Sequence, residues 1–174
     1  MTNRRTFLKI TITSVLMLGV LRFALGPFAL LKEKKYLLNK TYNFLTAKDH
    51  LMLTAIIPVM LKTSIKLNIK EINKIINNID ITIYGLPLEL QKELRELFTI
   101  LQFPVTRRLL AQVWSPWSQT KENEIESFLN SWRKSKLSLL RGAYQGLNEL
   151  IFASYYSQPE SWKSIGYDGP PKIL

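Results

Sequence analysis

Residues 137–155 read Leu-Ser-Leu-Leu-Arg-Gly-Ala-Tyr-Gln-Gly-Leu-Asn-Glu-Leu-Ile-Phe-Ala-Ser-Tyr, and this stretch decides the fold class. Its apolar residues recur in a seven-residue rhythm at Leu137, Leu140, Tyr144, Leu147, Ile151 and Tyr155. Leu139, Ala143, Leu150 and Phe152 add apolar side chains in between, which predicts a central helix buried on most faces. Gly142 and Gly146 lie four residues apart, a spacing that predicts the close approach of a second helix.

Helical patterns also cover the chain that precedes this stretch. Thr46 or Asp49 can cap a helix that continues to Leu61, and Pro58 predicts a kink in it. Three further apolar stripes have the period of an amphipathic helix. They are Ile72, Ile75, Ile76 and Ile79 in a helix from Ile69, then Leu90, Leu94, Leu97 and Leu101 after Pro87, and Ile125, Phe128, Leu129 and Trp132.

The remaining stretches are less regular. Pro104 predicts the start of a short helix that ends near Gln112. Ile81–Tyr84 has strand propensity but no neighbouring strand to pair with, so we expect an extended loop there. The tail from Ile165 to Pro171 contains too many helix breakers to be helical, and it is expected either to pack on the chain's own surface or to clasp a partner. The sequence therefore predicts a compact all-α bundle of five or six helices with an irregular C-terminal tail, preceded by an N-terminal signal helix.

Composition excludes several classes of chemistry. The chain has 174 residues, of which 47% are apolar, and it contains no cysteine and one histidine, His50. A disulfide scaffold, a thiolate metal site, a CxxCH haem attachment and a multi-histidine metal centre are therefore excluded. We expect His50 to be an exposed residue in the first turn of a helix. No catalytic, cofactor-binding or metal-binding residue is predicted in this chain.

The net charge of +11 is concentrated towards the N-terminus. Residues 1–31 carry +4, residues 32–87 carry +5 and residues 88–174 carry +2. A nucleic-acid-binding protein more often concentrates basic residues on its folded module, so no nucleic-acid partner is expected. Lys62, Lys66, Lys70 and Lys74 fit a solvated helix face, with an acidic partner or an anionic membrane as the alternative.

The N-terminus has the features of an export signal. Arg4 and Arg5 precede Phe7-Leu8-Lys9, and the apolar run from Ile10 to Leu21 follows. This order resembles the twin-arginine signal, although Asn3 stands where Ser or Thr is usual. Arg22 interrupts the apolar run after twelve residues, whereas a spanning helix needs about 20. We therefore predict export to the periplasm through the twin-arginine translocase.

The fate of this signal is open. Ala24-Leu25-Gly26 offers small residues for a signal peptidase, but proline at position 27 disfavours processing, so a retained tether in the inner membrane is the alternative. We divide the chain into a signal segment at 1–31, a linker at 32–45 and a helical accessory-subunit domain at 46–174. Export of a folded cargo also agrees with the absence of cysteine, because such a cargo folds in the reducing cytoplasm.

Several motifs occur together in the remaining chain. They are Leu53-Thr54-Ala55-Ile56-Ile57-Pro58, Glu93-Leu94-Arg95-Glu96-Leu97-Phe98, Arg107 or Arg108, Trp114-Ser115-Pro116-Trp117, Phe128–Ser135 and the tail from Tyr155 to Pro171. Over residues 44–171 the chain resembles the family of gluconate 2-dehydrogenase small (third) subunits. The family often has Pro-Gly after the early Ile-Pro stretch, where this chain has Val59-Met60-Leu61-Lys62.

The resemblance implies a non-catalytic role. Members of the family are small partners of flavin-dependent oxidoreductases of the glucose–methanol–choline class. They assist maturation of the flavoprotein, which typically lacks its own signal, and carry it across the membrane as a folded complex. The resemblance thus implies a flavin-dependent dehydrogenase large subunit as the partner, with FAD in that partner and no cofactor in this chain.

Aromatic residues are the candidate contacts with such a partner, because Trp and Tyr bury a large area at little entropic cost. The candidates are Trp114, Trp117, Tyr155, Tyr156, Trp162 and Tyr167. Trp132 is expected in the core. Arg133 and Arg141 are expected to pair with Glu126, Glu149 or a partner carboxylate.

Two other functions fit the sequence less well. One is a membrane-tethered periplasmic protein, structural or interacting, that never meets a flavoprotein. The other is a small enzyme that uses Glu93 and Glu96, although a solvated helix face explains both carboxylates.

Overall fold

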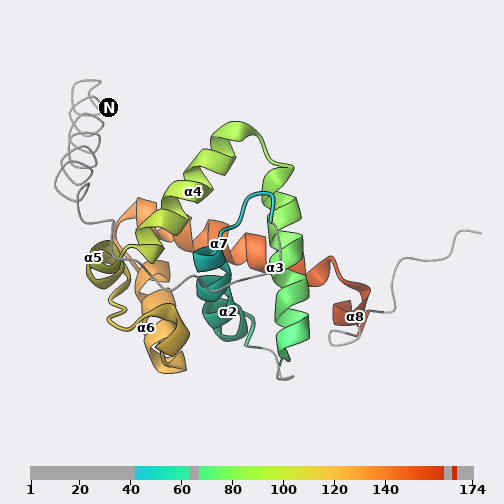
Figure 1. Ribbon diagram of the computed structural model, residues 1–174. Helices are drawn as coiled ribbons and strands as arrows, with labels where there is room; N and C mark the ends of the chain where they lie inside the picture. The colour runs from blue at the N-terminus through green and yellow to red at the C-terminus, as the bar shows by residue number, and fades with distance from the viewer. Residues whose placement is uncertain (1–41, 63–66, 163–165, 168–174) are drawn as a thin grey trace, which may run out of the picture. The chain divides into compact units, whose positions relative to one another are not determined.

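The computed structural model describes residues 42–62, 67–162 and 166–167, all within a compact unit that runs from Leu38 to Leu174. These residues form helices and no strand, so the all-α prediction is confirmed. Among the described helices, five have 12 residues or more: α2 (Ala47–Leu61), α3 (Ile69–Tyr84), α4 (Leu88–Gln102), α6 (Glu122–Arg133) and α7 (Ser138–Tyr156). Figure 1 shows their arrangement. Shorter elements are α5 (Pro104–Thr106), the π-helical η2 (Arg107–Ala111), the 3₁₀-helical η3 (Trp117–Gln119) and α8 (Pro159–Trp162).

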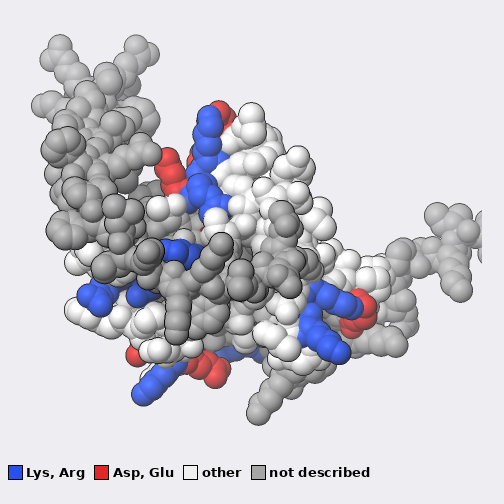
Figure 2. Space-filling view, viewed as in Figure 1, with Lys and Arg blue, Asp and Glu red and all other residues white. Residues whose placement is uncertain are grey.

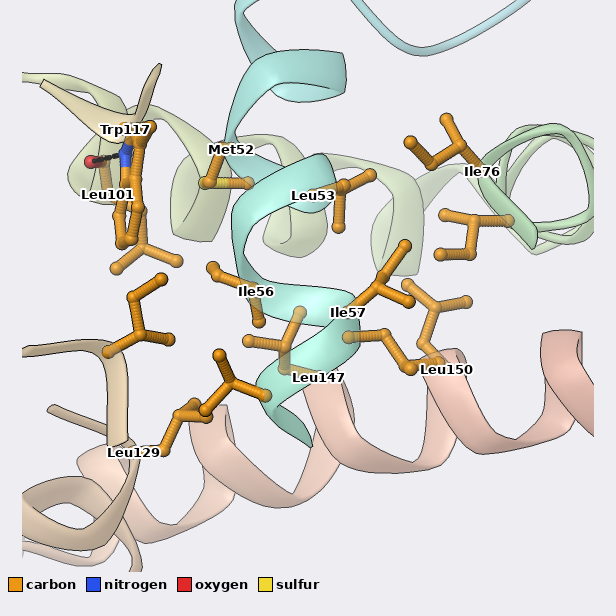
Figure 3. Packing of buried hydrophobic residues seen from close by; sticks show 14 of the residues in the cluster. Met52, Leu53, Ile56, Ile57, Ile76, Leu101, Trp117, Leu129, Leu147 and Leu150 are labelled. Carbon is orange, nitrogen blue, oxygen red and sulfur yellow. Dashed lines mark hydrogen bonds between the residues drawn. The ribbon is translucent and has the colours of Figure 1, made fainter. Parts of the chain in front are cut away.

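Helix α2 lies at the centre of the packing and contacts α3, α4, α6, α7 and η3. Its side chains Met52, Leu53, Ile56 and Ile57 are fully buried, and Figure 3 shows them between side chains of the surrounding helices. Burial of such a side chain contributes about 1.5–3 kcal/mol to the free energy of unfolding. With these four fully buried side chains and five neighbouring elements, α2 is the helix around which the core is organised. Thr46 caps α2 in a reciprocal capping box with Asp49, as the sequence predicts.

Helix α3 is longer than its sequence pattern suggests. Ile81–Tyr84 forms its last turn, so the prediction of an extended loop is wrong. The cause is Ile83, which follows Ile79 by one turn and is fully buried. Its burial outweighs the few tenths of a kcal/mol by which β-branched residues disfavour a helix.

Helix α7 is buried on one side only. Leu147, Leu150, Ile151 and Tyr155 are buried where α7 packs against α2 and α3, whereas Leu139 in its first turn is 76% exposed. The prediction of a helix buried on most faces is therefore wrong for its first half. No described atom outside the helix backbone lies within 4 Å of a Cβ built at Gly142 or Gly146, so the predicted close helix approach is also wrong.

The segment between α4 and α6 turns in an irregular way. Pro104 begins a helix, as predicted, but the chain continues as the π-helical η2 and ends at Gln112 in the left-handed region at φ 56°. A π-turn shifts the hydrogen-bond pattern by one residue, and such turns are frequent at functional sites. The carbonyl of Leu110 accepts a 2.7 Å hydrogen bond from Trp132 Nε1, which fastens η2 to α6.

Candidate interaction surface

A buried carboxylate on α3 holds the chain where the described domain begins. Asp80 Oδ1 accepts hydrogen bonds from the backbone N–H groups of Phe44 and Leu45 at 2.9 and 2.8 Å. Its Oδ2 accepts one from the N–H of Asn43 at 2.9 Å. Asp80 is 3% exposed, so these charge-assisted bonds compensate the burial of its charge. Burial raises the pKa of the nearby Tyr42 hydroxyl, and the negative charge of Asp80 raises it further.

A second buried carboxylate, that of Asp49 on α2, also binds groups near the start of the described chain. Asp49 Oδ2 accepts from the backbone N–H and the hydroxyl of Thr46 at 2.7 and 2.8 Å, and from Arg95 Nη1 at 2.7 Å. Gln102 donates to its other oxygen. Arg95 Nη2 donates to the carbonyl of Phe44 at 2.5 Å, and its guanidinium lies 4.1 Å from the centre of the Phe44 ring.

Together these contacts form what we call the N-terminal clamp: residues 43–46 with Asp49, Asp80 and Arg95. Four successive backbone N–H groups, from Asn43 to Thr46, all donate to the two carboxylates. The clamp joins α2, α3 and α4 at the point where the N-terminal segment meets the domain. Of the clamp, the sequence predicts only a helix cap at Thr46 or Asp49. A lone acid between Ile79 and Ile81 is the signal that points to Asp80.

His50 also links helices and is not the exposed residue expected. Its Nε2 lies 2.9 Å from Asn73 Oδ1, and its ring is 6.0 Å from that of Tyr42. The residue is half-buried between α2 and α3, a position that suits packing.

The candidate aromatic residues divide according to exposure. Trp117 and Tyr155 are buried in the chain's own core, and Trp117 Nε1 donates a 2.9 Å bond to the carbonyl of Leu101 (Figure 3). Trp132 is buried as predicted. Trp114 is 69% exposed, although only Ser115 and Pro116 separate it from Trp117.

Trp114 forms an exposed surface together with η2 and α5. The guanidinium of Arg108 lies 5.6 Å from the centre of a Trp114 ring. Val105, Arg108 and Leu109 are three and four residues apart and are all exposed, a spacing that places them on one side of a helical segment. We call these four residues the Trp114 surface. It combines an aromatic ring, a cation and aliphatic side chains. Trp and Arg are enriched among the residues that dominate the binding energy of protein interfaces.

The remaining aromatic candidates lie near α8. Trp162 is half-buried and donates a 2.7 Å hydrogen bond from Nε1 to the carbonyl of Tyr156. Its ring is 5.5 Å from that of Tyr167, which is exposed, and the Tyr167 N–H donates to the Trp162 carbonyl at 3.1 Å. The part of the tail that is described therefore folds back on α8. The rest of the tail lies outside the described residues.

The basic residues have partners that differ from those expected. Arg141 Nη1 donates to the carbonyl of Ser135 at 2.7 Å, and Arg133 is exposed in the last turn of α6. Glu126 pairs instead with Lys62, which raises the pKa of that lysine. Glu149 accepts from Gln145. The expected carboxylate partners of the two arginines are thus engaged elsewhere.

The other charged candidates lie in solvent. Lys70 and Lys74 are exposed on α3, as expected for a solvated face, and Lys74 pairs with Glu160 at 3.0 Å. Lys66 lies outside the described residues. Glu93 and Glu96 are also exposed. Within residues 42–62, 67–162 and 166–167, no group of three or more His, Asp or Glu side chains could hold a metal ion.

The export signal, Arg4, Arg5, Phe7, Leu8 and Lys9, lies outside the described residues. Among the helices that the structure does describe, none is long and apolar enough to cross a membrane. Comparison of the chain with protein families, with curated proteins and with solved structures gives no match. The resemblance to the gluconate 2-dehydrogenase small subunits therefore stays a prediction.

Proposed function

We propose that this chain is the non-catalytic small subunit of an exported, FAD-dependent dehydrogenase. It escorts the folded flavoprotein through the twin-arginine pathway to the periplasm and supports its maturation. FAD is bound by the partner. The observation that carries the proposal is Trp114, an exposed tryptophan beside an arginine on a helical domain that follows a twin-arginine sequence.

The escort role requires a contact that survives transport. A stable interface buries roughly 800 Å² on each partner, and a few Trp, Tyr and Arg residues usually dominate its energy. Trp114 and Arg108 have these chemical types and are already in contact. The π-helical turn and its bond to Trp132 hold the backbone next to Arg108, which lowers the entropic cost of binding.

The role also requires that a pull on the signal reach the folded domain. The N-terminal clamp suits this requirement, because it ties residues 43–46 to three helices. A partner bound to the domain is then linked to the same chain that the translocase recognises. The clamp thus supports the proposal that this chain carries its bound partner along during export.

The contact is tested with the full chain, tagged at its C-terminus and isolated from its source cell. We expect flavin absorbance to co-purify with the unmodified chain, and Trp114→Ala to reduce it at least tenfold, the equivalent of about 1.4 kcal/mol. Ile69→Ala is the control, because Ile69 is 56% exposed on α3. Co-purification that Trp114→Ala leaves unchanged would argue against the Trp114 surface, and an unmodified chain without any flavin would favour the tethered structural protein.

The transport step needs a separate variant. Replacement of Arg4 and Arg5 by lysine keeps the charge but removes the twin-arginine pair. We expect flavin-dependent dehydrogenase activity to remain in the cytoplasmic fraction of these cells, while the unmodified chain delivers it to the periplasm. Normal periplasmic activity with the lysine pair would sink the escort proposal.

A further inference from the structure

A second exposed apolar surface lies where α3 turns into α4. Ile81, Tyr84 and Leu88 are 65, 62 and 72% exposed, and Leu90 is 44% exposed. Residues 81–90, which we call the α3–α4 corner, contain one acid, Glu89, which pairs with Lys92 at 2.9 Å. Figure 2 shows that the surface over the end of α3 and the start of α4 is otherwise uncharged. The corner therefore differs from the Trp114 surface, which contains Arg108.

The corner is held in one conformation by its own hydrogen bonds. Gln91 Nε2 donates to the carbonyls of Tyr84 and Leu86, at 3.2 and 2.8 Å. The N–H of Leu86 donates to the carbonyl of Ile83 at 3.0 Å, and Pro87 is the N-cap of α4. The apolar side chains thus point to solvent from a fixed turn, and their exposure does not come from a loosely held loop.

The N-terminal segment joins the domain beside this corner. Asp80, which binds the N–H groups of Asn43, Phe44 and Leu45, immediately precedes Ile81 and stands one turn before Tyr84. The N-terminal clamp consequently fixes the start of the domain at the end of α3 that carries the corner.

The chain that precedes the clamp has the chemistry of a membrane-associated segment. Its apolar residues extend to Leu31, and residues 32–41 include Lys32, Lys34 and Lys35. Ten residues span at most about 36 Å, which limits how far the clamp can lie from a bilayer that holds the apolar run. Basic residues beside such a run are attracted to anionic headgroups.

We propose that the α3–α4 corner contacts the surface of the bilayer that holds the N-terminal apolar run. Ile81 and Leu88 enter the boundary between headgroups and acyl chains, and Tyr84 lies at headgroup depth, where tyrosine is enriched. Lipid is the partner because the corner is apolar and lies at the end of the domain to which the short linker connects. This inference goes beyond the proposed function; it rests on a retained N-terminal segment and not on whether the partner is a flavoprotein.

The absence of cysteine makes a site-specific test direct. The full chain is reconstituted into phosphatidylcholine–phosphatidylglycerol vesicles after Leu88→Cys or Ile69→Cys is labelled with an environment-sensitive fluorophore. Ile69 is the matched control, because it is exposed at the opposite end of α3, about 22 Å away along the helix. We expect nitroxide-bearing lipids to quench the Leu88 label at least about three times as strongly as the Ile69 label. The reason is that a shallowly inserted apolar face reaches about 5–10 Å into the boundary between headgroups and acyl chains.

Equal quenching of the two labels overturns the proposal. A second pair of variants tests the apolar side chains themselves, with the label at Leu90→Cys. Ile81→Glu combined with Leu88→Glu should abolish quenching of that label, whereas Ile69→Glu should leave it unchanged, with the helical circular dichroism retained in both. Persistent quenching in the doubly charged variant also overturns the proposal. Neither measurement includes the flavoprotein, so its outcome is independent of the escort test.

Discussion

At the scale of the residue, Asp49 is fully buried and depends on its donors. Arg95 Nη1 donates to this carboxylate at 2.7 Å, and the Arg95 side chain is one-third exposed. Removal of the arginine takes this cation away from a buried carboxylate, which is costly even after allowance for solvent near the guanidinium. Arg95 therefore contributes through charge and through its second bond to the Phe44 carbonyl.

We expect Arg95→Met to lower the free energy of unfolding by about 2–3 kcal/mol. Arg95→Lys keeps the charge but cannot donate to Asp49 and Phe44 with the same planar fork, so its loss should be smaller. Urea denaturation of both variants checks this order. Equal losses would show that the fork geometry, rather than the charge, governs the contribution of this residue.

The two tryptophans of the Trp114-Ser115-Pro116-Trp117 motif should respond differently to truncation. Trp117→Ala removes a buried ring and its bond to the Leu101 carbonyl, so we expect a loss of about 3–5 kcal/mol. Trp114→Ala removes an exposed ring and should change stability by about 0.5 kcal/mol or less. Thermal denaturation measures both, and a large loss for Trp114→Ala would assign that ring to the fold.

At the scale of the element, the apolar stripes predicted the long helices because burial repeats with the helical period. The buried positions of α6, Ile125, Phe128, Leu129 and Trp132, are the predicted ones. The last turn of α3 was missed because its β-branched residues favour a strand locally, and the burial of Ile83 depends on contacts distant in sequence. The π-turn at η2 could not be predicted, since its shifted hydrogen bonds leave no period in the sequence.

Helix α7 contains a glycine that the fold does not need. Gly142 is exposed within the helix, and no described atom outside the helix backbone lies within 4 Å of a Cβ built there. We expect Gly142→Ala to stabilise the protein by about 0.5–1 kcal/mol, because alanine restricts the unfolded chain and favours the helix. Gly166→Ala is the contrast, because Gly166 has φ +71°, a backbone conformation in which alanine is strained. Chemical denaturation that shows no gain at Gly142 would point to an unseen contact on that face.

Helix α8 is fastened to α3 by a pair that responds to acid. The Glu160 N–H, then the Lys74 ammonium, lowers the pKa of the Glu160 carboxyl below its ordinary 4.5. The pair therefore stabilises the fold above pH 4.5, and this contribution disappears as the pH falls through the lowered pKa. The difference in unfolding free energy between the unmodified chain and Glu160→Gln should shrink accordingly below pH 4.5. A difference that stays constant down to about pH 2 would contradict the assignment.

At the scale of the whole molecule, the candidate site was predicted only in part. The sequence indicates the Trp114-Ser115-Pro116-Trp117 motif, but it cannot separate the exposed ring from the buried one, because this short Ser-Pro turn has no apolar period that shows which ring faces the core. The clamp escaped prediction for a similar reason. Asp80 and Arg95 are far from residues 43–46 in sequence, and only the packing of α3 and α4 beside α2 brings them there.

The connection between the N-terminal segment and the domain should weaken when Asp80 is changed. Asp80→Asn leaves one acceptor oxygen for three N–H groups and adds donors that face them. We expect amide hydrogen exchange at Asn43, Phe44 and Leu45 to accelerate at least tenfold, the equivalent of about 1.4 kcal/mol. Asn43→Ala, which removes only a side-chain bond of 3.4 Å, is the control. Unchanged exchange at Phe44 and Leu45 would show that other contacts hold the segment.

The four successive N–H groups of the clamp also determine how the domain responds to mechanical force. A pull on the chain before Tyr42 acts on the bonds to Asp80 first and, through Phe44, on the bond to Arg95. The force is then shared among the N–H groups of residues 43–46, which bind the carboxylates of Asp80 and Asp49. Unwinding of one helical turn after another would instead release the force in steps. A pull on the chain before the clamp would thus be transmitted to α2, α3 and α4 together.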